Sequence, residues 1–260
     1  MVILFIGDIF GQPGRQCVRR WIPEIREEFS VDIIVANAEN AAGGLGATLD
    51  ILDELSGYGV EAFTFGNHTW RKKSMVDTID RFANVARPAN YAVGVPGQGS
   101  VVVNLQDGRK LGIINIMGRV FMEPIDCPFE TVEREIGIMK EEVDTILVDF
   151  HAEATAEKVA MGWYLDGTCS AVVGTHTHIP TADERVLPQG TAYITDVGMT
   201  GPQDSVIGVK KELIIKKFLT GMPVTFEVSK DNPGLRGVMI ETDDATGKAV
   251  SIQRIARDGL

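Results

Sequence analysis

The sequence predicts one α/β domain, and its length, its composition and its pattern of apolar runs all support that prediction. The chain has 260 residues, which is near the upper limit of what one hydrophobic core fills. Hydrophobic residues make up 44% and charged residues 23%, which excludes a disordered or fibrous chain. Short apolar runs alternate with stretches of helical spacing, as in α/β folds. No repeat or linker divides the chain, so we expect one domain over residues 1–260, with two smaller domains as the alternative.

The predicted strands are short runs rich in β-branched residues and bounded by Gly, Asn, Asp or His. Because apolar residues fill nearly every position of these runs, we expect the sheet to be covered on both faces, as parallel sheets are. The expected strands are Val2–Ile6, Asp32–Ala38, Ala62–Phe65, Ser100–Leu105, Lys110–Met117, Thr145–Phe150, Ala171–Gly174 and Thr191–Thr195.

The predicted helices follow most of these strands and show apolar residues at helical spacing. They are Arg15–Phe29, Thr48–Ser56, Ser74–Phe82, Phe129–Glu142, Thr155–Leu165 and Val209–Leu219. The C-terminal part of the chain instead alternates apolar and polar residues between the turn sequences Asp-Asn-Pro-Gly and Asp-Asp-Ala-Thr-Gly. This pattern predicts an antiparallel sheet that closes the fold, with strands at Pro223–Val228, Leu235–Glu241 and Ala249–Arg254.

Charge and cysteine content exclude several classes of protein. Acidic residues outnumber basic ones by 36 to 25, for a formal net charge of -11, which argues against long nucleic acid as a partner. Cys17, Cys127 and Cys169 are widely separated and odd in number, so they predict neither a disulfide framework nor a zinc ribbon. We interpret them as reduced packing residues.

The N-terminus and the apolar runs argue against export and against a membrane. The first residues are apolar but lack a basic segment and soon reach Asp8, which is unlike a signal peptide. No run approaches the ~20 apolar residues of a membrane helix. We therefore expect a cytoplasmic protein without a membrane partner, and the sequence leaves homo-oligomer formation open.

Polar residues with metal-binding chemistry gather at the ends of the predicted strands. In α/β sheets, functional sites lie outside the carboxyl ends of the strands. All 4 histidines of the chain occur at such ends, together with two acids and two asparagines. The candidate residues are Asp8, Glu39, Asn40, Asn67, His68, His151, His176 and His178. Taken singly, a histidine here could be a packing residue and Asp8 a helix cap.

The pair His176 and His178 favours a metal over packing. Alternate residues of an extended chain point the same way, so the two imidazoles should reach one place. Adjacent imidazoles repel when charged, and a metal ion removes that cost. The oxygen and nitrogen ligands are too many for one structural zinc but suit two ions about 3.5–4 Å apart, with Glu39 bridging them. Such a ligand mixture fits iron, manganese or zinc better than calcium or magnesium.

The ordered motifs resemble a known superfamily. Gly7-Asp8, Ala38-Glu39-Asn40, Gly66-Asn67-His68, His151 and Gly174-Thr-His176-Thr-His178 are similar to the calcineurin-like metallophosphoesterases. Within that superfamily, the sequence resembles the YmdB-like branch of cyclic-nucleotide phosphodiesterases over essentially the whole chain. Two motifs depart from most of the superfamily: Asp8-Ile-Phe10 replaces Asp-x-His, and Ala38-Glu39-Asn40 replaces Gly-Asp-x-x-Asp. These departures weaken any transfer of metal identity or substrate from better-known phosphatases.

The resemblance implies a fold and a set of ligands. The implied fold is a four-layer αββα sandwich with two central mixed sheets. Two divalent transition-metal ions are implied, iron or manganese ahead of zinc. One ion would be held by Asp8, Glu39, Asn40 and His178, and the other by Glu39, Asn67, His151 and His176.

The resemblance also implies an activity. It is the hydrolysis of 2′,3′- or 3′,5′-cyclic nucleotides by a metal-bridging hydroxide, with His68 giving a proton to the leaving oxygen. His68 could instead only order Asn67 or the hydroxide. Alternative functions are a phosphomonoesterase on the same site and a metal-containing regulatory nucleotide-binding protein that acts through a protein partner.

Two further segments could meet the substrate. Arg71-Lys72-Lys73 follows His68 and would either contact the phosphate or form a solvated helix start. The segments Arg87–Tyr91 and Ala92–Gly99 are placed to border a base pocket. The glycine-rich segment Gly43-Gly-Leu-Gly46 lacks the lysine of a phosphate-binding loop. We therefore expect no nucleoside triphosphate to bind there.

Overall fold

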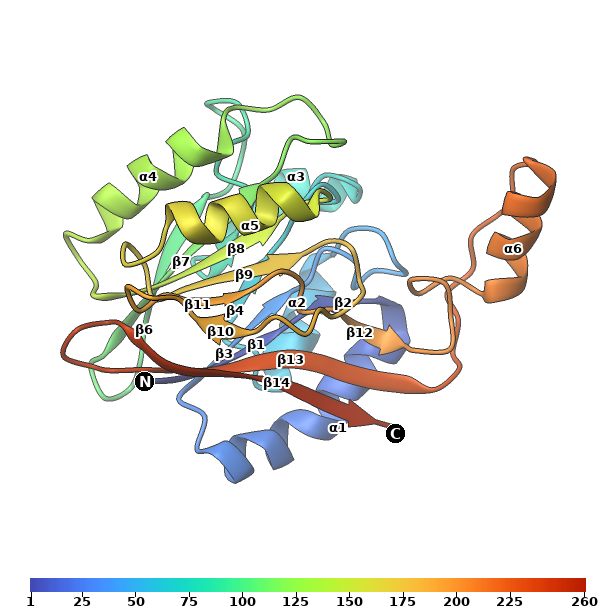
Figure 1. The fold of residues 1–260 in the computed structure, drawn as a ribbon. Helices are drawn as coiled ribbons and strands as arrows, with labels where there is room; N and C mark the ends of the chain where they lie inside the picture. Colours follow the sequence, from blue (N-terminus) through green and yellow to red (C-terminus); the bar gives the residue numbers. More distant parts are fainter.

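Two mixed β-sheets pack face to face, and helices cover the outer face of each (Figure 1). The computed structural model describes residues 1–260. The order of the layers is helix, sheet, sheet, helix, as the resemblance implied. The prediction of an α/β fold with two central mixed sheets is therefore confirmed.

The first sheet has 8 strands in the order β2-β12-β13-β1-β3-β4-β5, with β14 also paired to β13. Strands β1, β3, β4 and β5 run parallel, whereas β13 lies antiparallel to both β1 and β14. The strands are β1 Val2–Ile6, β2 Asp8–Ile9, β3 Ile33–Asn37, β4 Ala62–Thr64, β5 Val85–Ala86, β12 Met199–Pro202, β13 Pro233–Thr242 and β14 Ala249–Asp258.

The second sheet has 6 strands in the order β10-β11-β9-β8-β7-β6. Its four central strands run parallel, and the two edge strands run antiparallel to their neighbours. The strands are β6 Ser100–Asn104, β7 Lys110–Met117, β8 Thr145–His151, β9 Ala171–Thr175, β10 Arg185–Val186 and β11 Ala192–Ile194.

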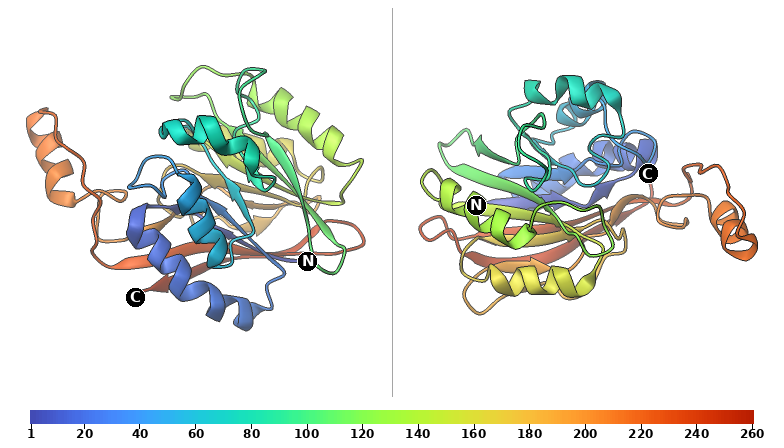
Figure 2. Two further views of the ribbon diagram at one scale, coloured as in Figure 1. Left: turned by 180° about the vertical axis from the view of Figure 1, so that it is seen from behind. Right: turned by 90° about the horizontal axis from the view of Figure 1, so that it is seen from above.

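Helices α1, α2 and α3 pack on the first sheet, and α4 and α5 pack on the second. Helix α6 stands away from both sheets (Figures 1 and 2). The helices are α1 Gly11–Phe29, α2 Leu49–Gly57, α3 Lys73–Thr78, α4 Pro128–Met139, α5 Thr155–Tyr164 and α6 Lys211–Thr220, and a 3₁₀ turn over Ile79–Arg81 follows α3. No helix has both the length and the apolar character needed to cross a membrane.

The continuous apolar runs of the sequence are explained by burial on both faces of each sheet. In β1, Ile3 and Phe5 pack between the sheets, whereas Leu4 and Ile6 pack against the helices. Side chains alternate between the two faces of a strand. A strand that is buried by the other sheet on one face and by helices on the other therefore needs apolar residues at every position. The three cysteines are free thiols, two of them buried.

Several predicted elements need correction. Residues 223–228 form no strand, and only Val228 makes an isolated bridge, to Val209. This segment alternates in the sequence, but it returns from α6 with no sheet edge beside it. The expected helix over residues 74–82 ends at Thr78 and continues as the 3₁₀ turn. The short strands β2, β5, β10 and β12 were not expected.

The connection from β12 to β13, residues 203–232, carries α6 and is called the α6 arm below. It projects from the end of the first sheet, and α6 lies at its far tip (Figures 1 and 2). The base of the arm lies close to the carboxyl ends of the strands, because Ile207 and Val228 border the same cavity as His178.

Candidate metal centre

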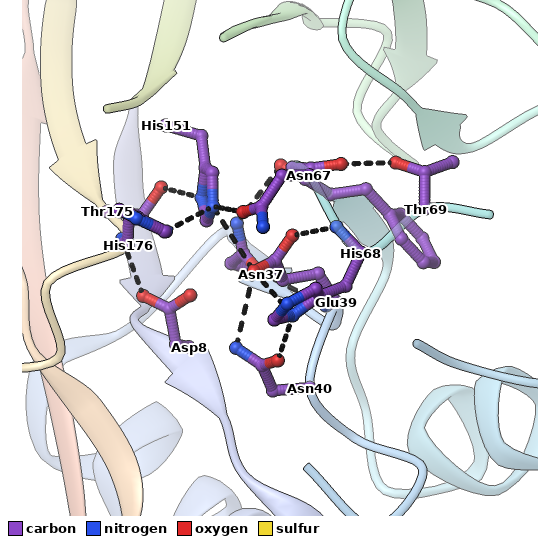
Figure 3. Close-up of polar contacts among 12 residues, drawn as sticks. Asp8, Asn37, Glu39, Asn40, Asn67, His68, Thr69, His151, Thr175 and His176 are labelled. Atoms are coloured by element: carbon purple, nitrogen blue, oxygen red, sulfur yellow. Dashed lines mark hydrogen bonds and ion pairs between the residues drawn. The ribbon is translucent and has the colours of Figure 1, made fainter. Parts of the chain in front are cut away.

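The candidate residues from both sheets lie together where the strands end (Figure 3). The first sheet supplies Asp8 at the start of β2 and the residues after β3 and β4, and the second supplies His151 at the end of β8 and the residues after β9. Hydrogen bonds or ion pairs connect all of the residues that sequence analysis singled out. They are Asp8, Glu39, Asn40, Asn67, His68, His151, His176 and His178.

Four of these side chains point their ligand atoms at one another, and we call Glu39, Asn67, His151 and His176 the His151 group. Nε2 of His151 lies 3.1 Å from Oε1 of Glu39, 3.0 Å from Oδ1 of Asn67 and 3.1 Å from Nδ1 of His176. The ligand atoms of Glu39, His151 and His176 lie within 4.8 Å of one another. Lone pairs brought this close repel unless a proton or a cation lies between them.

Three further candidates, Asp8, Asn40 and His178, form a second cluster that we call the His178 group. Nε2 of His178 lies 3.8 Å from Oδ1 of Asp8 and 3.1 Å from Nδ2 of Asn40. Asp8 is fully buried, its Oδ1 has no hydrogen-bond partner, and burial raises its pKa. An orphaned buried carboxylate oxygen is costly, and a bound cation would satisfy it. The residues present therefore fit a metal ion.

Asn40 is the one candidate ligand whose oxygen points away from both groups. Its Nδ2 faces Glu39 and His178, while its Oδ1 lies 2.7 Å from Nδ1 of His68. A half-turn of the amide would exchange the two atoms, which are chemically distinct but nearly the same size.

A buried network that sequence analysis missed fixes the ring of His151. The Thr175 hydroxyl donates to Asp149 at 2.7 Å, so the contact of 2.9 Å between Thr175 and Nδ1 of His151 requires Nδ1 to donate. Nε2 of the neutral ring then keeps its lone pair for the His151 group. Asp149 also accepts from Thr64 at 2.5 Å and from Asn37 at 3.0 Å, and burial raises its pKa to about 6.

The acids of the site draw positive charge onto His151. Burial works to lower the pKa of His151, but the charge and hydrogen bond of Glu39 raise it to about 9. Burial works to raise the pKa of Glu39, but His151 and His68 hold it well below its usual range. Burial and the charge of His151 lower the pKa of His176 to about 3. A cation at the same position would replace the proton on His151.

His68 lies at the edge of the site and is part of neither group. Its side chain is 21% exposed, and its backbone N–H donates to Oε2 of Glu39 at 3.0 Å. Nδ1 contacts Asn40, which leaves Nε2 without a hydrogen bond inside the protein. This nitrogen is free to exchange a proton with a bound molecule.

The two histidines after β9 reach the site in a way that the sequence did not predict. We expected an extended chain, but His176 has φ 99 and His178 has φ 68, in the left-handed region that favours glycine. Such strain persists only where the surroundings impose it. Here His176 N–H donates to Asp8 at 3.2 Å, and Met199 N–H donates to the carbonyl of His178 at 3.1 Å. The turn sends the two imidazoles to different groups.

The side chains of the basic residues near the site do not contact the candidate ligands. Arg71 and Lys73 are exposed, and neither side chain makes a hydrogen bond or ion pair to the candidate site residues. Arg87 is buried, and its guanidinium donates to the carbonyls of Pro88, Val95, Pro96 and Gly97. Arg87 thus holds its own loop together, rather than facing a base.

A cavity of about 260 Å³ adjoins the site. Asn40, His68 and His178 form its polar end, and Leu45, Ile207 and Phe226 are among its apolar walls. A larger cavity of about 720 Å³, which borders Arg26 and Asp107, contains none of the candidate residues. The smaller cavity is therefore the candidate functional cavity, because it adjoins the candidate metal ligands.

Comparisons with known proteins agree with this geometry. The family described as "YmdB-like protein" matches residues 4–255. The chain is 50% identical over 255 residues to the 2′,3′-cyclic-nucleotide 2′-phosphodiesterase of Bacillus subtilis, and the match covers 98% of this chain and 96% of that protein.

Two solved structures are similar along almost their whole length. A hypothetical protein from Thermus thermophilus has a TM-score of 0.92 and 40% identity, and the match covers 99% of both chains. A novel phosphatase of Mycoplasma pneumoniae has a TM-score of 0.93 and 36% identity, covering 99% of this chain and 93% of that one.

Proposed function

Because the chain belongs to the YmdB-like protein family, we propose that it is a metal-dependent phosphodiesterase that hydrolyses 2′,3′-cyclic nucleotides. One structural observation carries the proposal: the ligand atoms of Glu39, His151 and His176 lie within 4.8 Å of one another, next to a buried and unpaired oxygen of Asp8. The name of the Bacillus subtilis relative supports the choice of substrate. Hydrolysis of 3′,5′-cyclic nucleotides is a second activity to test on the same site.

The two groups of side chains divide into two candidate ion sites. We assign one ion to Asp8, Glu39, Asn40 and His178, and the other to Glu39, Asn67, His151 and His176. Glu39 would serve both, because its Oε1 lies 3.1 Å from Nε2 of His151 in one group and 3.3 Å from Nδ2 of Asn40 in the other. Asn40 would bind through Oδ1 after its amide turns. Nitrogen and oxygen ligands without sulfur favour iron or manganese, with zinc as the alternative.

The residues around the ion sites suit a hydrolysis in which the leaving group is a strongly basic alkoxide. Two bound divalent ions supply a nucleophilic water at neutral pH and offset the charge of the phosphate oxygens. His68 would protonate the departing ribose oxygen from Nε2, the ring nitrogen that makes no hydrogen bond inside the protein. Glu39 accepts from the backbone N–H of His68, and this bond would keep the ring beside a bound phosphate.

The proposal is tested by elemental analysis of the purified protein together with a panel of substrates. We expect about two transition-metal ions per chain and faster hydrolysis of 2′,3′-cyclic nucleotides than of nucleoside monophosphates. A protein that is fully active without metal would overturn the proposal.

A phosphomonoesterase is the second candidate, because one similar structure is described as a phosphatase. The same panel separates the two functions. Release of phosphate from nucleoside monophosphates at the higher rate would favour the monoesterase.

A further inference from the structure

The cavity beside His68 has one polar end, and apart from Glu227 its other side chains are apolar. Leu45, Ile207 and Phe226 line it and are 47%, 49% and 55% exposed. Large apolar side chains left half in water beside a polar site are typical of a surface that a ligand covers. No lysine or arginine lines this cavity, so it does not suit a phosphate.

The wall residues are held in place by the backbone. Leu45 lies between Gly44 and Gly46, whose φ angles of 88 and 74 form a tight loop that presents the leucine outward. Ile207 is tied directly to the site, because Nδ1 of His178 donates to its carbonyl at 3.1 Å. The same contacts that position the His178 group therefore shape the cavity.

The chemistry of the proposed reaction decides which part of the substrate lies here. The oxygen that receives the proton from His68 stays on the ribose after the phosphodiester bond breaks. The ribose and its base must therefore lie on the His68 side of the phosphate. The cavity of about 260 Å³ includes His68 among its walls.

On this basis, and resting on the proposed function, we propose that the cavity binds the nucleoside part of the substrate. The base would stack on Phe226 and be flanked by Leu45 and Ile207. Stacking on an aromatic ring tolerates every base, because each base has a π face.

The cavity offers few groups that could choose among bases. Glu227 is the only acidic side chain among its walls, and Lys210 pairs with it at 2.6 Å. Asn40, His68 and His178 face the metal end. We therefore expect the enzyme to accept purine and pyrimidine cyclic nucleotides with similar efficiency.

The test compares a cyclic nucleotide with a base-free analogue, the 2,3-cyclic phosphate of 1-O-methylribose. In Phe226→Ala, the ratio of kcat/KM for the nucleotide to that for the analogue should fall roughly 10-fold, mainly through KM. Leu45→Ala should lower the same ratio, because Leu45 lines the same cavity. Phe218→Ala is the matched control, since Phe218 is 81% exposed on α6 and borders no part of the cavity.

A second measurement does not need turnover. Adenosine, which lacks a phosphate, should compete with product binding to the metal-loaded protein, and the competition should weaken in Phe226→Ala. An unchanged ratio in both wall variants, an equal fall in Phe218→Ala, or no competition by adenosine would overturn the assignment. If the wild type hydrolyses neither substrate, the proposed function fails, and the adenosine measurement still decides the fate of the cavity assignment.

Discussion

At the scale of single residues, a hydrogen-bonded series of three side chains sets the orientation of His151 in the site. Asp149, Thr175 and His151 are joined through a hydroxyl that can donate only once, and this fixes which nitrogen of His151 faces the other ligands. Such outer partners of a metal-binding histidine set both its orientation and its basicity.

Removing that hydroxyl should weaken metal binding without unfolding the protein. Thr175→Val keeps the shape of the side chain but leaves Nδ1 of His151 without its acceptor. We expect a 10–100-fold loss of metal affinity, measured by competition with a chelator. Thr131→Val is the matched control, because Thr131 is also buried but lies in α4. Equal affinities in the two variants would contradict a positioning role.

His68→Ala should separate metal binding from proton transfer. The variant should keep its metal content and lose about 10²–10⁴-fold in turnover of 2′,3′-cyclic nucleotides. The loss should be much smaller on bis(p-nitrophenyl) phosphate, because nitrophenolate leaves without a proton. An equal loss on both substrates would mean that His68 only orders its neighbours.

The sequence predicts the side chains of the site better than it predicts their supports. The candidate ligands end strands and differ from their apolar neighbours, and the structure does bring them together. Asp149 gave a signal that was overlooked, since it is a charged residue inside the run Ile-Leu-Val-Asp-Phe. Thr175 gave none, because a threonine is ordinary in a strand. The left-handed turn at His176 depends on bonds to distant residues, which local sequence does not show.

At the scale of elements, a buried ion pair anchors the turn that carries two candidate ligands. Lys158 of α5 reaches Asp196 at 2.6 Å, and both side chains are almost completely buried. Asp196 also accepts from the backbone and the hydroxyl of Thr177, at 3.1 and 2.6 Å. The helix thus supports the turn between His176 and His178.

Lys158→Met should therefore be strongly destabilising. It leaves the charge of Asp196 buried and unpaired, which costs about 3–5 kcal/mol in comparable cases. Urea denaturation would measure the loss. The double variant Lys158→Met with Asp196→Asn should recover part of it, because no charge is then stranded. A single variant as stable as the wild type would show that the pair contributes nothing net.

Long helices and strands can be predicted from the sequence, whereas very short ones cannot. Strands such as β7 and β8 and helices such as α5 show enough periods for their type to be recognised. β2 and β5 span two residues each and exist because a neighbouring strand lies beside them. Residues 223–228 show the reverse case, in which a strand-like pattern has no neighbour and forms no strand.

At the scale of the whole molecule, the candidate metal centre joins the two sheets. Glu39 and Asn67 come from the first sheet, and His151 and His176 come from the second. Asn37 of β3 and Asp149 of β8 add a hydrogen bond across the interface at 3.0 Å. Separating the sheets would therefore expose both an apolar layer and a buried polar site.

We propose that residues 1–260 unfold as one domain. Trp21 lies in α1 on the first sheet and Trp163 in α5 on the second, so variants that keep only one of them report on each half. Both should lose their native fluorescence at the same urea concentration, in step with far-UV circular dichroism. Two separate midpoints would indicate two independent units.

Removal of metal should lower the stability of both halves together. A ligand present at 100 times its Kd adds about 2.7 kcal/mol to the free energy of unfolding of the state that binds it. Treatment with a chelator should reduce Tm, and Mn²⁺ should restore it. A Tm that is indifferent to chelation in a protein shown to contain metal would contradict the bridging role.

The order of the strands also determines when the enzyme can mature during its synthesis. β1 is the first strand to be made, yet one of its two neighbours is β13, near the end of the chain. The proposed ligands span Asp8 to His178, so a ribosome-bound chain holds an incomplete centre until its second sheet has emerged. We therefore expect metal loading to be a late event in biogenesis, and a prematurely terminated chain that lacks β9 should not retain the full complement of ions.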